Sequence, residues 1–348
     1  MDICTKTDNP MNGKAPVIEF YRYVFMVVLL AWHWHGGTKY FSNGYLVVEF
    51  FFILSGYLLM ESYLKRTKTA VQYTVDKLKR TYWEYFVAFC ISFLYFGVLA
   101  KYVNHIPFSM EMFFKFIYEA ALIQSIGIFT GINANYPMWY FSVLIWGGAL
   151  LYYLISKYTE LSTHLFIPLI SLIALTYLSH QGDSLESSSI EGGVFYIPFI
   201  RGIAEMGLGI LLCTFAHSRY NKIRSSKCID CLSVIALVLT FYLFDASGNY
   251  AKYVFLTFPL IIFAGMQNRS FLHALFQHKI WLKLGGITWE MYLIHAVLGN
   301  AVYNILIELG FSWNIYWFIL YVVIATCAAF VFKSGCQKLQ YKLFQHKG

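Results

Sequence analysis

The feature that most constrains this chain is a series of ten long apolar runs between residues 17 and 332. A helix needs about 20 mostly apolar residues to cross the hydrocarbon core of a bilayer, and each run approaches that length. The sequence therefore predicts an all-α integral membrane protein, a bundle of about ten transmembrane helices with no soluble domain. The runs cover residues 17–35, 45–64, 82–100, 138–156, 161–179, 194–216, 229–246, 251–267, 284–305 and 312–332.

Composition excludes the other broad classes of protein. Hydrophobic residues make up 59% of the 348 residues and charged residues only 13%, about half of the roughly 25% found in soluble domains. A soluble globule could not hide so much apolar surface, and a disordered chain requires low hydrophobicity. We therefore expect one membrane domain over residues 17–335, with cytoplasmic tails at residues 1–16 and 336–348. Residues 104–136 are semi-polar, which predicts an interfacial helix or a re-entrant segment.

The distribution of positive charge orients the bundle. The formal net charge is +8, and with the N-terminus inside, the cytoplasmic segments hold 20 of the 26 Lys and Arg residues while the external segments hold four. This asymmetry follows the positive-inside rule and predicts an even number of spans in the plasma membrane, with both termini cytoplasmic. Membrane lipids thus account for the basic charge, and nucleic acid is not an expected partner.

The cysteines predict neither a disulfide framework nor a metal site. There are seven, an odd number, and most lie in or beside apolar runs, where free buried thiols are the usual state. Cys228 and Cys231 form a single CxxC pair with no second pair or nearby His in the sequence to complete a zinc site. We expect no metal.

Ionisable residues within the first apolar run are the clearest functional signal. Arg22 and His33 are 11 residues apart. In a helix this separation is about 20° more than three full turns and about 16 Å along the axis. Both side chains therefore lie on one face, and Glu19 shares that face one turn earlier. The alternative is that Arg22 extends to the inner headgroups and His33 lies at the outer interface.

Two further segments carry charge in unusual places. Glu49 lies within an apolar run, next to a Ser55-Gly56 pair of small residues that permits close helix packing. The basic run of residues 77–80 lies at the cytoplasmic start of the third predicted span, just before its apolar residues. Its Lys79 and Arg80 could bind phosphate, and Arg is suited to bidentate contacts. Ordinary positive-inside bias explains most of the charges in that run equally well.

Five segments of the chain carry a recognisable pattern: RYVFMVVLLAWH, FFILSGYLL, DKLKRTYWEY, RGIAEMGLGILL and ITWEMYLIH. Together they resemble the acyltransferase 3 family of integral membrane acyltransferases. The first helix carries the family's spacing of an Arg, ten residues and a His, and the others follow in the family's order across residues 19 to 295. Thr288-Trp289 replaces the usual Ser-Tyr of the last pattern, and the region after Trp139 matches loosely.

The resemblance implies transfer of an acyl group, usually acetyl, from cytoplasmic acyl-CoA to a carbohydrate of the cell envelope. Acetyl-CoA is then the donor co-substrate, and a polysaccharide or lipid-linked saccharide is the acceptor. It further implies that Lys79, Arg80 and Glu19 contribute to donor binding, and that Trp139, Tyr292 and His295 contribute to substrate binding. His295 could equally be a hydrogen-bonded member of the bundle.

His33 is the expected general base, because an imidazole titrates near neutral pH and can take the proton of an attacking hydroxyl. An acyl-histidine intermediate is the mechanistic alternative. Arg22 would position the donor, and Glu49 would orient the imidazole or bind the acceptor. His35 is a weaker candidate, since two residues of helix turn it to the opposite face.

Two other functions use the same buried charges. One is a transporter or flippase for an anionic lipid-linked saccharide, and the other is a non-catalytic membrane subunit of an envelope-polymer synthase. Neither requires the Arg22–His33 spacing together with a phosphate-binding inner face, so these two features distinguish the acyltransferase hypothesis from them.

Overall fold

The computed structural model describes residues 15–34, 41–65, 68–99, 110–124, 135–180, 196–218, 227–246, 249–266, 271–311 and 314–344. Within these ranges every regular element is helical, which confirms the predicted all-α class. The α-helices are α1 (Pro16–Trp32), α2 (Val47–Leu64), α3 (Ala70–Ser92), α5 (Met110–Ala120), α6 (Trp139–Lys157), α7 (Thr159–Leu161), α8 (Ile167–His180), α9 (Ile197–His217), α10 (Lys227–Leu243), α11 (Val254–Gly265), α12 (Phe271–Leu275), α13 (Lys279–Gly285), α14 (Thr288–Glu308) and α15 (Ile315–Phe344).

Shorter helical segments extend or precede several of these helices. The 3₁₀ turns η1 (Gly44–Leu46), η4 (Tyr136–Met138) and η7 (Asn249–Tyr253) lead into α2, α6 and α11. The π-helical segments η2 (Phe93–Leu99) and η5 (Ser162–Phe166) continue α3 and join α7 to α8.

Each of the ten apolar runs coincides with a helix, and the chain is a multi-pass membrane protein. Within the described ranges, seven of the helices are long and apolar enough to cross a bilayer by length and composition. The other three runs form α1 and α10, of 17 residues each, and α11, of 12 residues. The seven are Gly44–Leu64, Ala70–Leu99, Tyr136–Lys157, Thr159–His180, Ile197–His217, Thr288–Glu308 and Ile315–Leu343.

Three boundaries differ from the sequence-based expectation. The third span begins at Ala70, about three turns before the predicted start, because Thr69 and Gln72 form a capping box that stabilises an earlier first turn. The predicted C-terminal tail continues α15 as helix as far as Phe344. The semi-polar segment contains α5, whose Phe116 packs on Phe89 of α3 with ring centroids 5.0 Å apart, so this helix lies against the bundle. Residues 1–14 of the expected N-terminal tail lie outside the described residues.

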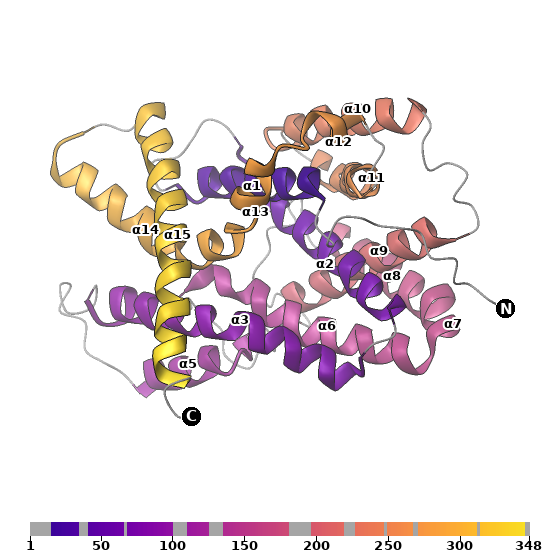
Figure 1. Ribbon diagram of the computed structural model, residues 1–348, viewed down its shortest axis with the longest axis horizontal. Helices are drawn as coiled ribbons and strands as arrows, with labels where there is room; N and C mark the ends of the chain where they lie inside the picture. The colour runs from indigo at the N-terminus through magenta and orange to yellow at the C-terminus, as the bar shows by residue number, and fades with distance from the viewer. Residues whose placement is uncertain are drawn as a thin grey trace.

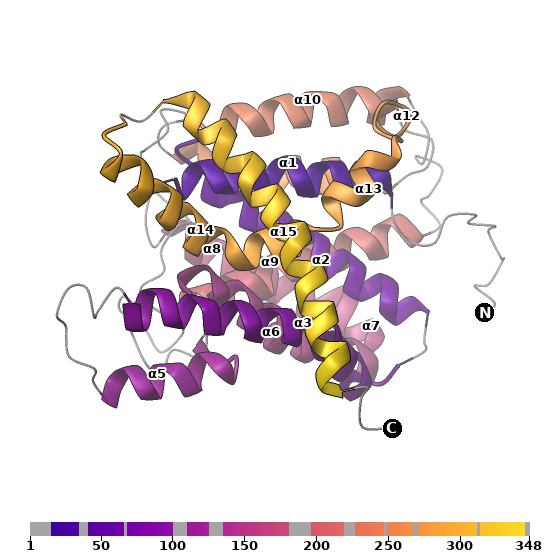
Figure 2. The same cartoon turned by 60° about the vertical axis from the view of Figure 1, so that its left-hand side comes forward.

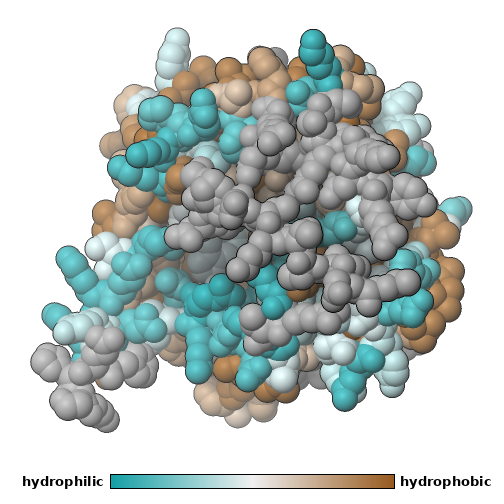
Figure 3. Space-filling view, turned by 45° about the vertical axis from the view of Figure 1, so that its right-hand side comes forward, coloured by the Kyte–Doolittle hydropathy of each residue, from teal (hydrophilic) through white to brown (hydrophobic). Residues whose placement is uncertain are grey.

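The helices surround α1, which lies between α14 and α15 on one side and α2 and α11 on the other (Figure 1). The long α15 runs obliquely in front of α1 and α3 in the second ribbon view (Figure 2). The Trp83 indole of α3 donates a hydrogen bond to the Cys336 carbonyl of α15. At the end of the molecule where α2 and α9 finish, hydrophilic residues gather while hydrophobic residues lie along the flanks (Figure 3). This distribution is the one expected of a bundle whose flanks contact lipid.

Glycines set the close approach of α2 and α9, the most extensively packed pair of helices. A Cβ atom on Gly56 would lie 1.9 Å from the Met206 carbonyl oxygen, and one on Gly209 would lie 1.9 Å from that of Ile53. No side chain fits at either place, because the obstacle is backbone. The small-residue patch predicted at Ser55-Gly56 is therefore confirmed as a packing feature.

We predict that Gly209→Ala destabilises the protein although alanine favours helix. The added methyl group must separate α2 from α9, and overpacking of this kind costs about 1–3 kcal/mol. Gly335→Ala in α15 is the matched control, since nothing lies within 4 Å of its Cβ position and alanine gains up to about 1 kcal/mol in a helix. Thermal unfolding of the purified proteins in detergent measures both. An unchanged midpoint for Gly209→Ala would contradict the close approach.

Candidate functional site

Two histidines from distant parts of the chain meet at the end of α1. His33 caps α1, and its Nδ1 lies 3.2 Å from Nε2 of His295, which projects from α14. His295 is buried and His33 is half-buried. The structure thus brings together two of the residues expected at the site.

The hydrogen bonds assign the protons on this pair. Nδ1 of His295 lies 2.7 Å from the Tyr292 carbonyl oxygen, and a carbonyl only accepts, so Nδ1 of His295 carries the hydrogen. In neutral His295 the Nε2 atom is then an acceptor, and the His33 Nδ1–H donates to it. The basic nitrogen of neutral His33 is therefore Nε2. When that atom takes a proton, the Nδ1–H bond to His295 is retained and orients the imidazolium.

The segment before α6 forms a wall beside the two rings. Tyr136 in η4 packs edge-on against His33, with ring centroids 5.3 Å apart. The Tyr292 hydroxyl donates to the Pro137 carbonyl, and the Asn135 side-chain amide donates to the Leu293 carbonyl at 3.1 Å. These two bonds fasten η4 to α14. Tyr292 is expected from the family resemblance to bind substrate, but its hydroxyl is hydrogen-bonded to a backbone carbonyl.

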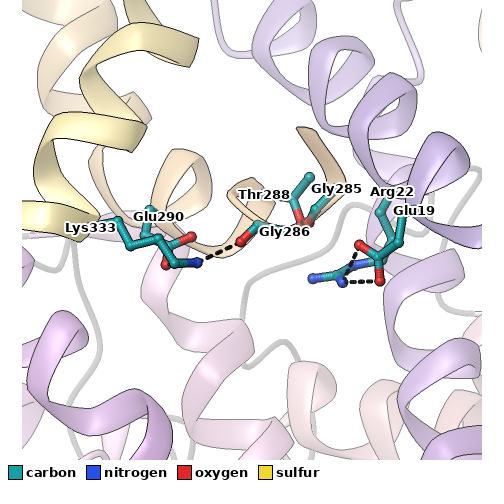
Figure 4. Close-up of polar contacts among 7 residues, drawn as sticks. All are labelled: Glu19, Arg22, Gly285, Gly286, Thr288, Glu290 and Lys333. Carbon is teal, nitrogen blue, oxygen red and sulfur yellow. Dashed lines mark hydrogen bonds and ion pairs between the residues drawn. The ribbon is translucent and has the colours of Figure 1, made fainter. Parts of the chain in front are cut away.

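Arg22 and Glu19 form an ion pair on the same helix. Their closest atoms, a guanidinium nitrogen and a carboxylate oxygen, lie 2.8 Å apart, and the Arg22 side chain is 27% exposed against 6% for Glu19. Arg22 extends away from α1 beside the turn that joins α13 to α14 (Figure 4). On the other side of that turn Lys333 donates to the Gly286 carbonyl at 2.6 Å and pairs with Glu290 at 2.8 Å.

Glu49 belongs to a second buried cluster. Its carboxylate lies 2.5 Å from the Arg201 guanidinium, and Glu205 pairs with the same Arg201 at 3.2 Å. The guanidinium also lies 5.7 Å from the ring centroid of Trp139, a cation–π contact. The structure therefore joins Glu49 and Trp139 through Arg201, whereas His33 meets His295.

Tyr140 connects the two clusters. Its ring lies 5.6 Å from that of Tyr292 and 4.4 Å from that of Phe52, and its hydroxyl lies 3.4 Å from the Ser55 hydroxyl. Trp139 precedes it directly on α6. An aromatic layer thus runs from the histidine pair to the Arg201 cluster.

The basic run of α3 points in two directions. Lys77 extends inward, with Nζ 3.5 Å from the Tyr73 hydroxyl and 3.4 Å from the Leu144 carbonyl of α6. Lys79 and Arg80, the two residues predicted to bind the donor, are exposed. Leu144 is four residues from Tyr140, about 6 Å along α6, so the Lys77 ammonium lies about one helical turn from the aromatic layer.

Sequence reasoning missed three residues of this arrangement. Arg201 and Glu205 are ionisable residues four positions apart in an apolar run, a spacing that allows an ion pair on a helix, but nothing in the sequence joins them to Glu49. Lys77 was part of the basic run without being singled out, because the sequence does not reveal which face of α3 packs against α6. His35 lies outside the described residues.

We predict that Arg201→Met lowers the yield of folded protein sharply. It leaves two buried carboxylates without their shared cation, and breaking a buried ion pair in this way costs about 3–5 kcal/mol. Glu205→Gln should be much milder, because Arg201 keeps Glu49. Fluorescence-detected size-exclusion chromatography of both variants measures the folded fraction. Equal yields would contradict a structural role for Arg201.

Comparison with known proteins agrees with the family resemblance. A family model described as an acyltransferase domain matches residues 17–333, which include every described residue of the two clusters and Lys77. No curated protein and no solved structure matches the chain significantly. The chain therefore belongs to the acyltransferase 3 family and is a membrane acyltransferase.

Proposed function

We propose that the protein transfers an acyl group, most simply acetyl, from cytoplasmic acyl-CoA to a hydroxyl of a cell-envelope or exported carbohydrate. The observation that carries this proposal is the histidine pair: His33 lies on the helix that also carries Arg22, and His295 fixes its orientation. A general base needs an oriented lone pair, and the hydrogen bonds assign one to His33 Nε2.

The proposed reaction uses this atom. His33 Nε2 takes the proton of the acceptor hydroxyl as the oxygen attacks the thioester carbonyl. The new C–O ester bond forms, the C–S bond breaks, and the proton passes from His33 to the leaving thiolate. His295 stays neutral and holds the ring through the His33 Nδ1–H. It is a positioning residue, comparable to the third member of a catalytic triad.

The donor would bind along α1 from the cytoplasmic side. Arg22 lies about 16 Å from His33 along the helix, a span similar to that of a pantetheine arm, and Lys77 offers an inward ammonium group. Lys79 and Arg80 remain candidates for the nucleotide phosphates at the inner surface, where exposed cations attract anions over about a Debye length. Glu19 would hold the Arg22 guanidinium in place for the donor.

This arrangement fits a protein of the plasma membrane with both termini in the cytoplasm. The nucleotide end of acyl-CoA then stays at the inner face, and the thioester end reaches the histidine pair near the outer side, where the sugar hydroxyl arrives. The CoA molecule itself does not have to cross the membrane.

We predict that His33→Ala abolishes detectable transfer, since loss of a general base costs roughly 10²–10⁴ in rate. His295→Ala should lower kcat strongly with little change in KM for the donor, because it disorients His33 without contacting substrate. His35→Ala is the matched control and should be mild. The assay follows radiolabelled acetyl transfer from acetyl-CoA into envelope glycan at equal protein levels.

Two outcomes would contradict this proposal. If His33→Ala retained activity and His35→Ala lost it, the general base would be His35 and its assignment to His33 would be wrong. Full activity of both variants would remove the general-base mechanism, and export of a lipid-linked saccharide without acetyl transfer would favour the transporter.

We predict that Lys77→Met raises KM for acetyl-CoA about tenfold or more, because it removes a cation held inside the bundle rather than at the surface. Lys79→Met, two residues along the same helix but exposed, should have a smaller effect that disappears at high salt. Steady-state kinetics at low and high salt separate the two. If KM and its salt dependence changed equally in both variants, Lys77 would contribute only to the general surface charge.

A further inference from the structure

Three potential metal ligands meet where α2 and α9 end. His217 closes α9, Cys213 precedes it by one turn, and Glu61 projects from the last turn of α2. One ligand atom from each lies within 4.8 Å of the other two. The Cys213 thiol is buried, whereas the His217 and Glu61 side chains are 45% and 31% exposed, so an ion can enter from solvent.

The hydrogen bonding of His217 indicates that a cation is needed here. Its Nδ1 lies 3.0 Å from the Cys213 carbonyl oxygen, so Nδ1 carries the hydrogen and Nε2 of the neutral ring presents a lone pair. That lone pair faces a Glu61 carboxylate oxygen at 3.4 Å. Two acceptors repel each other unless a proton or a metal ion lies between them.

The distance favours the metal ion over the proton. Charge-assisted N–H···O bonds are about 2.7–2.9 Å long, which is shorter than the separation found. Two ligands bound tetrahedrally to zinc at about 2.0–2.1 Å each lie roughly 3.4 Å apart. A histidine that ligates a metal also characteristically donates its second ring N–H to a backbone carbonyl, which is the contact His217 makes.

The third group completes a recognisable donor set. The Cys213 sulfur is the third ligand atom of this group, within 4.8 Å of the other two, and a thiolate, an imidazole and a carboxylate together suit zinc better than calcium or magnesium. We propose that Glu61, Cys213 and His217 bind Zn²⁺, with the fourth position open to water. The bound ion links α2 to α9 at the end of the same helix pair that holds Glu49 and Arg201.

The site is independent of the Cys228–Cys231 pair, whose two thiols are exposed at the start of α10. Those thiols would bind metal ions nonspecifically in an experiment. The test therefore uses the 348-residue chain with Cys228→Ser and Cys231→Ser, purified in detergent without a polyhistidine tag. Cobalt(II) serves as the probe because a tetrahedral thiolate complex gives charge-transfer and d–d absorption bands, and zinc then displaces it.

We expect one cobalt ion per chain, with a thiolate charge-transfer band that Cys213→Ser removes. His217→Ala and Glu61→Gln should each weaken binding at least about tenfold, the smallest effect typical of altered metal sites. Zinc should also raise the unfolding temperature of the parent and leave that of His217→Ala unchanged. Cys90→Ser, which removes a thiol of α3 far from this cluster in sequence, is the matched control and should bind as the parent does.

Other results would overturn the proposal. Absence of saturable binding would show that a proton alone bridges Glu61 and His217. Binding that persists in both His217→Ala and Glu61→Gln would locate the metal elsewhere. Both substitutions replace partly exposed side chains, so they test the site even if Cys213→Ser, which alters a buried group, folds poorly.

Discussion

The cost of placing charge inside an apolar bundle is the constraint on which the rest of the structure depends. Arg201 neutralises the two buried glutamates around it, Glu49 and Glu205, and its pair with Glu49 ties α9 to α2 within the bundle. Lys333 does the same for Glu290 and links α15 to α14. These pairs fix which helix faces meet, because a slip of one residue would leave a buried charge without its partner. The glycines of α2 and α9 then allow the contact to be close.

Lys77 meets this constraint in a different way. Its contacts are a phenol oxygen and a backbone carbonyl, which accept hydrogen bonds but do not neutralise an ammonium charge. In this part of the chain the structure describes an ion pair between Lys68 and Asp76, which does not include Lys77. A cation turned inward without a carboxylate partner is suited to an anion that arrives with a substrate, and the proposed donor carries phosphates. The same feature would weaken the bundle if no anion ever bound.

Local periodicity made part of this site predictable. The helical repeat placed Arg22 and His33 on one helix and one face, and a continuous α1 that ends at His33 satisfies that requirement. The early start of α3 was encoded in the Thr69–Gln72 pattern and could have been found. The partners of His33 and Glu49 could not be predicted from the sequence. His33 and His295 are 262 residues apart, and pairing at that range depends on how whole helices pack. Such contacts leave no periodic trace in one sequence.

The contacts of α1 explain how the Arg22–His33 distance could be used. Near its start, Glu19 lies directly against Gly285, where a Cβ would come within 2.3 Å of the carboxylate. At its end, His33 meets His295 on α14. The helix is therefore held against the α13–α14 unit at both ends of the stretch that carries Arg22 and His33. If the proposed donor binds along α1, a separation fixed in this way would select it by length, since a shorter arm anchored near Arg22 would not bring its thioester to the imidazole. Specificity for the proposed donor would then come from helix geometry.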